Sequence, residues 1–219
     1  RLLRLADEAE AAVRSGRPLG SFRLGALEST AGARLPPLLA RFNHDYPQAR
    51  VELVTGTTGA LLTRLARHDI EAAFVSEPFT APGMHARPVF DEELILIGPR
   101  SGPPIARATE LGRTTLIAFA QGCSYRRRLE DWLGRDNVLP ERVLEFASYP
   151  AIVACVAAGS GVAIVPRSVL ASLDAAAQIR EHPLPPDIAR NRTHLLWHPG
   201  EPSLALHGLL ALLGNAPDA

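Results

Sequence analysis

The segment Val143–Pro166 constrains the fold more than any other part of the chain. It begins with Val143–Ala147, a short apolar run that predicts a strand, and continues into a predicted helix over Ala151–Ala158. Ser148 is placed where its hydroxyl can cap this helix, and Pro150 suits the first helical turn. The segment therefore turns directly from strand to helix.

The end of the same segment predicts a second strand. Gly159 and Gly161 can adopt the positive φ that commonly ends a helix. Val162–Val165 is apolar on both faces, which is typical of a strand in a parallel sheet covered by helices. Strand, helix and strand together make a βαβ unit, so we expect an α/β fold.

The same corner, a strand that runs into hydroxyl residues and then a helix, recurs three times. The further corners are Phe22–Leu27 with Glu28–Thr30, Val51–Val54 with Thr55–Gly59, and Leu116–Phe119 with Gln121–Ser124. In an open α/β sheet the carboxyl ends of the strands line the ligand crevice, so these hydroxyls and helix amino termini should converge there. This arrangement favours a small-molecule sensor over an enzyme.

Composition narrows the class of protein. The chain has 219 residues, is 47% hydrophobic and carries a formal net charge of zero, so it can form a large core and has no basic footprint for nucleic acid. No apolar run reaches the roughly 20 residues that span a bilayer, so we expect no membrane partner. Two cysteines and no recognisable signal sequence favour the cytoplasm.

The chain divides into a leader and two lobes. Arg1–Arg14 predicts an amphipathic helix followed by a linker, so residues 1–20 are either a helix packed on its own domain or the end of a dimerising linker. Pro99–Pro104 is the expected crossing point between lobes. Lobe I is predicted over 21–99 plus about 188–219, because the strand Thr193–Trp197 and the helix Ser203–Leu213 are expected to return, and lobe II over 100–187.

The residues resemble a known family, the LysR-type transcriptional regulators, and specifically their effector-binding domain. The resemblance covers nearly the whole chain and is most specific at Val156–Pro166 (VAAGSGVAIVP). Weaker matches are Leu2–Val13, Leu24-Gly25, Leu35–Phe42, Tyr46-Pro47, Val51–Leu53 with Gly56 and Leu61, and Ile70–Phe74. His68 and Glu71 depart from the family, which usually has Gly and Asp there.

The resemblance implies two Rossmann-like lobes, similar to type 2 periplasmic binding proteins, with a hinged cleft between them. It implies a small polar or anionic effector, such as a carboxylate, in that cleft. DNA would be bound only by a winged helix-turn-helix that is not in these residues. The resemblance also implies a homodimer or tetramer, for which the stripes Leu38–Phe42 and Leu129–Leu133 could supply surfaces.

Six hydroxyls match positions that commonly face the effector in this family. They are Ser29, Thr30, Thr57, Thr58, Ser124 and Ser148. Helix amino termini offer free N–H donors and about half a positive charge, which suits a carboxylate or another small polar group. Each hydroxyl can instead be an ordinary helix cap.

The start of the helix at Tyr125–Leu133 completes the predicted site. Tyr125 and Arg126 follow Ser124, and Arg126 is the candidate anion contact because cations in a first helical turn oppose the dipole. Arg127 can pair with Glu130 or Asp131, and Arg128 is expected to be solvated. Cys123 is either a small thiol that lines the cleft or a redox sensor with a lowered pKa.

Other functions have less support. His194 and His198 lack a third ligand nearby in sequence, so neither a metal site nor a cofactor is expected. The sequence contains no Walker, GxGxxG or GxSxG motif and no acid–base constellation, so nothing in it points to an enzyme. An exported solute-binding protein of the same fold remains the alternative, although the helical leader argues against it.

Overall fold

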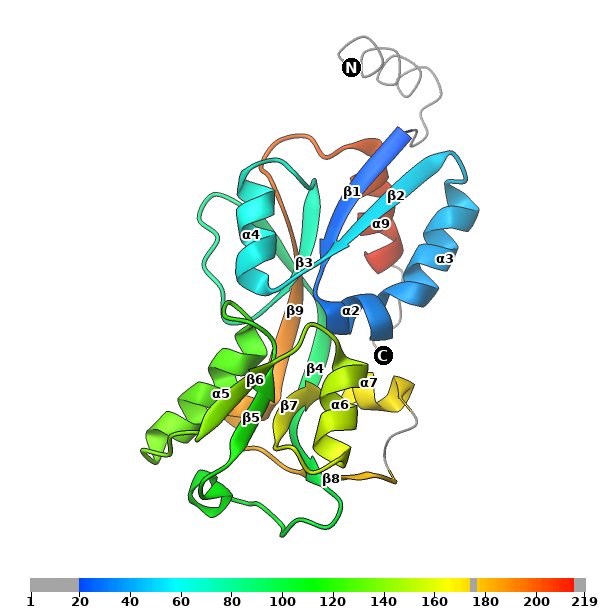
Figure 1. The fold of residues 1–219 in the computed structure, drawn as a ribbon. Helices are drawn as coiled ribbons and strands as arrows, with labels where there is room; N and C mark the ends of the chain where they lie inside the picture. Colours follow the sequence, from blue (N-terminus) through cyan, green and yellow to red (C-terminus); the bar gives the residue numbers. More distant parts are fainter. Residues whose placement is uncertain (1–19, 174–176, 215–219) are drawn as a thin grey trace.

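The computed structural model describes residues 20–173 and 177–214, which form two lobes joined by two long strands (Figure 1). The predicted α/β fold with two lobes is confirmed. The helix predicted over Arg1–Arg14 lies outside the described residues.

The upper lobe is a sheet covered by helices on both faces. Its strands are β1 (Gly20–Ala26), β2 (Ala49–Thr55) and β3 (Ala72–Ser76), and its helices are α2 (Glu28–Ala33), α3 (Leu35–Asp45), α4 (Thr58–Ala66) and α9 (Leu204–Gly214). β1 lies between β2 and β3 and is parallel to both. Helix α4 covers one face, and α3 and α9 cover the other (Figure 1).

Helix α3 shows how the sequence produces this layer. Leu35, Leu38 and Phe42 recur at helical spacing and are all buried. Pro36 and Pro37 lie in the first turn, where backbone N–H groups have no helical partner, so the missing N–H of proline costs no hydrogen bond. A separate short helix, α2, precedes α3, so the single helix expected from this region is divided in two.

The lower lobe contains the segment that most constrains the fold. Its strands are β5 (Thr115–Ala118), β6 (Arg142–Glu145), β7 (Ala163–Pro166) and β8 (Ile179–His182). Its helices are η1 (Ala108–Leu111), α5 (Ser124–Arg135), α6 (Tyr149–Ala157), α7 (Arg167–Ser172) and α8 (Pro186–Ala189). The short helices α7 and α8 were not expected from the sequence.

Strand β6, helix α6 and strand β7 follow one another as predicted. However, β6 pairs in parallel with β5, whereas β7 pairs antiparallel with β4, so β7 lies mainly in an antiparallel ladder and not in the expected parallel sheet. Helix α6 ends with Gly159 at a φ of 84°, as expected for a left-handed helix terminus. Val162, directly before β7, forms a single parallel bridge with Leu116 of β5. A Cβ at Gly161 would collide with the carbonyl oxygen of Thr115. Only glycine therefore allows the backbone to pass this close to β5.

Two antiparallel strands, β4 (His85–Pro99) and β9 (Arg190–Trp197), pass between the lobes. β9 lies beside β3, while the far end of β4 (Leu94–Pro99) pairs with β7 and β8. Both strands therefore belong to the structure of both lobes. The lobe boundaries predicted at residue 99 and near residue 188 stay a prediction.

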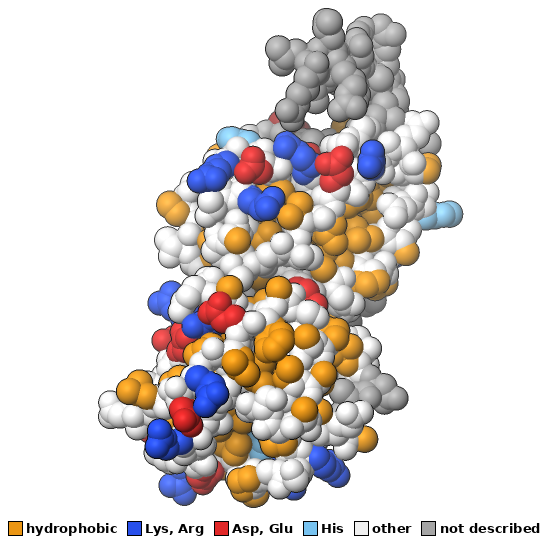
Figure 2. Space-filling view, in the orientation of Figure 1, with side chains coloured by type: hydrophobic (Ala, Val, Ile, Leu, Met, Phe, Trp, Pro, Cys, Tyr) orange, Lys and Arg blue, Asp and Glu red, His pale blue; other side chains and the backbone are white. Residues whose placement is uncertain are grey.

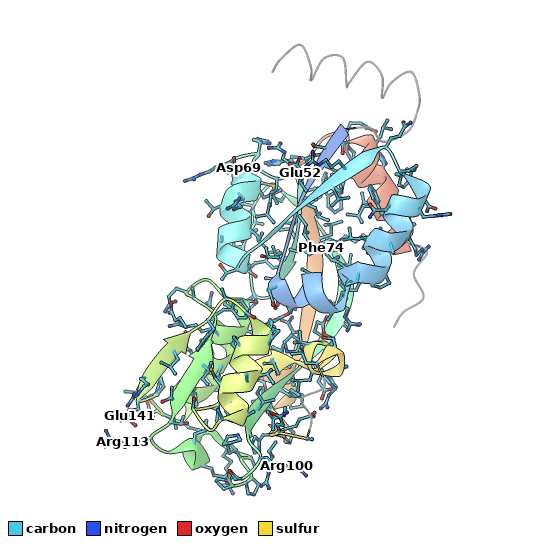
Figure 3. All side chains as sticks on the ribbon, turned by 45° about the vertical axis from the view of Figure 1, so that its right-hand side comes forward. Glu52, Asp69, Phe74, Arg100, Arg113 and Glu141 are labelled. Atoms are coloured by element: carbon cyan, nitrogen blue, oxygen red, sulfur yellow. The ribbon has the colours of Figure 1, made fainter. Side chains whose placement is uncertain are left out.

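The apolar stripes proposed as dimer surfaces are instead part of the core. Leu38, Phe42, Leu129 and Leu133 are all buried, so that part of the sequence interpretation is wrong. Phe74 is buried inside the upper lobe, whereas the exposed residues Asp69, Arg100, Arg113 and Glu141 lie at the periphery (Figure 3). None of the described helices is long and apolar enough to cross a bilayer.

Candidate functional site

A small cavity lies between the lobes, where the first turns of four helices meet. It leaves ≈ 10 Å³ in which the centre of a water-sized molecule can lie, which is room for about one water. Its lining residues are Leu27, Glu28, Ser29, Gly56, Thr57, Phe119, Cys123, Ser124, Tyr125 and Tyr149. The predicted convergence of strand–helix corners is therefore present in the structure.

The hydroxyl corners differ in how their side chains are used. Thr57 is a helix cap, because its Oγ1 accepts from the N–H of Ala60 at 3.3 Å. Thr58 is buried, and its hydroxyl bonds the backbone N–H and carbonyl of Ser76, both at 3.3 Å. These threonines stabilise the start of α4, and only Thr57 lines the cavity.

Three hydroxyls at the cavity have no hydrogen-bond partner among the residues that the structure describes. The side-chain oxygens of Ser29, Ser124 and Tyr125 are buried and make no hydrogen bond. The Tyr125 hydroxyl lies near those of Ser29 and Ser76 without hydrogen-bonding geometry, and burial raises its pKa to about 12. An unsatisfied buried polar group costs about 1–3 kcal/mol, so this site favours a polar occupant.

The two lobes touch directly at the edge of the cavity. The N–H of Gly59, at the start of α4, donates to the carbonyl oxygen of Gly122, before α5, at 3.2 Å. Gly122 has a φ of 90°, and a Cβ there would lie 3.1 Å from the Thr57 hydroxyl. The two lobes are thus in direct backbone contact beside the cavity.

Arg126 does not line the cavity. Its Nε donates to Glu130 at 2.8 Å, and its Nη1 donates to Glu145 and to the Phe119 carbonyl. Glu130, one of the two partners considered for Arg127, therefore pairs with Arg126. The guanidinium is held by two carboxylates, which leaves it poorly placed as an anion contact.

Arg128 is not simply solvated, contrary to expectation. It is half-buried, and its Nε donates to the Glu77 carbonyl at 3.3 Å. Its Nη1 donates to the carbonyls of Asp187 and Ile188. The side chain therefore joins α5 to the segments that follow β3 and precede β9.

Cys123 lines the cavity as a partly buried free thiol. Burial raises its pKa, and this effect outweighs the backbone N–H groups of Arg126 and Tyr125, which lower it. A raised pKa leaves less of the reactive thiolate at neutral pH. The suggestion that this thiol has a lowered pKa is therefore wrong.

Sequence reasoning located part of this cavity. Of the predicted residues, Ser29, Thr57, Cys123, Ser124 and Tyr125 line it, while Thr30, Thr58, Arg126 and Ser148 do not. Ser148 occupies the N-cap of α6 but makes no side-chain capping bond. Whether any of these residues contacts an effector stays a prediction.

Glu28 and Tyr149 were missed, although each is adjacent to a predicted hydroxyl. Oε1 of Glu28 accepts from the N–H of Tyr149, at the start of α6, at 3.4 Å. Burial raises the pKa of Glu28, and the bond from Tyr149 lowers it by less. The ring centroids of Tyr149 and Phe119 are 4.8 Å apart, so aromatic surface lines the same space.

Comparison with known proteins identifies relatives of this chain. The family model described as "LysR substrate binding domain" matches residues 15–217. The HTH-type transcriptional regulator GltR of Bacillus subtilis (strain 168) is 37% identical over 183 residues, which are 83% of this chain and 62% of GltR. The HTH-type transcriptional regulator SoxR of Arthrobacter sp. (strain TE1826) is 30% identical over 92% of this chain and 68% of SoxR.

Solved structures share the fold. The Synechocystis CcmR regulatory domain, in complex with 2-PG, has a TM-score of 0.77 at 23% identity, covering 90% of this chain and 99% of that one. A full-length OxyR variant from Pseudomonas aeruginosa has a TM-score of 0.77 at 20% identity, covering 97% of this chain and 76% of that one. At these identities the likeness concerns the fold alone.

Proposed function

The chain belongs to the family of LysR substrate-binding domains, and we propose that it senses a small polar effector between its two lobes and relays that binding to a DNA-binding domain elsewhere in a transcriptional regulator. GltR and SoxR are named as transcriptional regulators, and the chain spans only 62% of the length of GltR. The proposed link to DNA binding therefore rests on the family. The effector step rests on the cavity.

The observation that carries the proposal is the cluster of unpartnered hydroxyls where the lobes meet. Ser29 belongs to the upper lobe, and Ser124 and Tyr125 belong to the lower lobe. A ligand that bonds all three would satisfy groups from both lobes at once. Such a ligand stabilises the arrangement of the lobes in which it reaches both of them, in proportion to its preference for that arrangement, which is how binding can shift a conformational equilibrium.

Calorimetric titration tests this site. Small carboxylates, amino acids and amines are first screened by thermal shift, and the ligand found is then titrated into a Ser29→Ala/Ser124→Ala variant. Each lost hydrogen bond contributes roughly 0.5–1.5 kcal/mol, so affinity should fall about fivefold to a hundredfold or more. Thr30→Ala/Ser148→Ala is the matched control, because neither residue lines the cavity. Equal effects of the two double variants would place the ligand elsewhere.

We also propose a homodimer in which the two copies lie side by side. Apolar side chains gather on the outer surface over β2 and α3 and around α6 (Figure 2). They include exposed Pro37, Ala40 and Leu53 in the upper lobe and Pro150 and Ala154 in the lower lobe. Pairing the upper lobe of one copy with the lower lobe of the other would cover both surfaces.

Analytical ultracentrifugation tests the dimer. Ala154→Arg adds a charge to the exposed face of α6 and should shift the chain to monomer while leaving its circular dichroism unchanged. Gly134→Arg, on an exposed position of α5, serves as the control. A wild-type chain that sediments only as monomer at tens of micromolar would refute the proposal.

A further inference from the structure

The cavity contains a carboxylate that forms no ion pair with a cation of the described residues. Glu28 lies in the first turn of α2, is half-buried and lines the cavity. Its only hydrogen bond within the described residues is the long one from the N–H of Tyr149 at 3.4 Å. The lining includes no Lys, Arg or His. Partial burial of a carboxylate without an opposite charge is unfavourable, so the site favours a cation.

Arg126 and Arg128 of α5, and Arg34 after α2, already have other partners. Arg126 is bonded to two glutamates, and Arg128 is bonded to three backbone carbonyls. Arg34, which follows α2, donates its Nε to Glu92 at 2.8 Å. Neutralising Glu28 with any of them would break an existing bond. A cationic ligand can supply the charge that these three side chains do not.

The other lining groups suit the remainder of such a ligand. The rings of Phe119 and Tyr149 offer aromatic surface, against which an ammonium or its alkyl chain can pack. The unpartnered hydroxyl of Ser124 lies at the amino terminus of α5, and that of Tyr125 lies near Ser29 and Ser76. These donors can bind a carboxylate or a neutral polar group at the opposite end of the ligand.

We propose that the effector carries an ammonium group, which Glu28 binds directly, and that the cavity rejects acids that lack one. The proposal rests on the proposed function and narrows its effector to small amines and amino acids. Discrimination comes from both sides. An ammonium gains a charge-assisted hydrogen bond, whereas a carboxylate without an ammonium meets the negative charge of Glu28.

Matched pairs of probes test the charge requirement by titration calorimetry. Each pair differs only in the ammonium group: L-glutamate and glutarate, L-alanine and propionate, 4-aminobutyrate and butyrate. Putrescine and 1,4-butanediol extend the series to ligands without a carboxylate. At least one ammonium probe should bind, and its partner should bind at least about tenfold more weakly. Comparison of the amino acids with putrescine then distinguishes zwitterions from simple amines.

Substitutions at Glu28 test its role directly. Glu28→Gln keeps the side-chain shape and an acceptor for the Tyr149 N–H, and should weaken the ammonium probe at least about tenfold. Glu28→Asp keeps the charge and should retain the preference for ammonium at lower affinity. Glu52→Gln is the matched control, because Glu52 lies on β2 away from the cavity and its carboxylate accepts from Ser21 (Figure 3). It should leave binding unchanged.

The outcomes separate this inference from the proposed function. If acids without an ammonium bind as tightly as their partners, or if Glu28→Gln binds the ammonium probe unchanged, the inference is wrong while the effector site stands. If no probe of either kind binds the folded chain, both are contradicted. If Glu28→Gln does not fold, as judged by circular dichroism, the matched pairs and Glu28→Asp still decide the question.

Discussion

A buried ion pair that connects the lobes should stabilise the fold far more than its exposed neighbour on the same strand. Glu92 on β4 has a side chain only 4% exposed; its Oε1 accepts from Arg34 Nε at 2.8 Å and its Oε2 from Ser168 Oγ at 2.7 Å. Arg34 follows α2 in the upper lobe and Ser168 belongs to α7 in the lower lobe. Glu92 therefore holds one residue from each lobe.

A double-mutant cycle with Arg34→Met and Glu92→Met measures this pair. Methionine preserves most of each side chain's volume, so packing changes little. Arg34→Met leaves a buried carboxylate with one partner, and removing a partner from a buried pair costs about 3–5 kcal/mol. Because Arg34 is 23% exposed, water can partly replace it, and we expect about 2–3 kcal/mol. The coupling between the two substitutions should be about 1.5–3 kcal/mol.

The adjacent pair of Asp91 and Arg192 provides the control. Its atoms are 3.0 Å apart, but the side chains are 84% and 56% exposed, so its coupling should be below about 1 kcal/mol and should vanish in high salt. Urea unfolding at pH 7, followed by circular dichroism, supplies the free energy of unfolding for each variant. Equal coupling in the two pairs, or coupling below about 0.5 kcal/mol for Glu92, would refute the reasoning.

Three further predictions concern single positions. Gly161→Ala should destabilise the chain by more than about 2 kcal/mol, because its Cβ meets the Thr115 carbonyl, whereas Gly134→Ala in α5 meets nothing and should stabilise it by about 0.5–1 kcal/mol; urea unfolding compares them. Burial raises the pKa of Glu28, so the folded chain binds its proton at a higher pH than the unfolded chain, and charging this group lowers stability as pH rises. Glu28→Gln should therefore stabilise the fold more at pH 7 than below pH 4, and equal effects in thermal melts would contradict this sign. Burial also raises the pKa of Cys123, so iodoacetamide should modify it several-fold more slowly in the folded chain than in urea at pH 7.5, as measured by peptide mass spectrometry.

Local sequence patterns were sufficient to predict most elements of the two lobes. The apolar spacing of Leu35, Leu38 and Phe42 predicts α3, because a helical stripe needs a buried surface. The residues around Gly159 predict the end of α6, because glycine alone adopts a left-handed terminus without strain. Short helices such as α7 escaped prediction because six residues contain too few repeats to show a period.

The candidate site was only partly predictable. Hydroxyls that follow strands identify the edge where helices begin, and this locates Ser29 and Ser124. The same reasoning selects Ser148, which shares the corner but does not line the cavity. Which of two neighbouring side chains faces inward depends on the rotation of a helix about its axis, and that rotation is set by packing.

Charge assignments depended still more on tertiary structure. The sequence by itself determined that Arg126 opens a helix and that Glu28 precedes Ser29, since these facts follow from residue order. Only the folded chain decided that Arg126 pairs with Glu145 on a neighbouring strand and that Glu28 has no cationic partner among the described residues. Pairing and burial bring together groups far apart in sequence, so the free energy of each charge, and with it the chemistry of the cleft, is fixed by the tertiary structure.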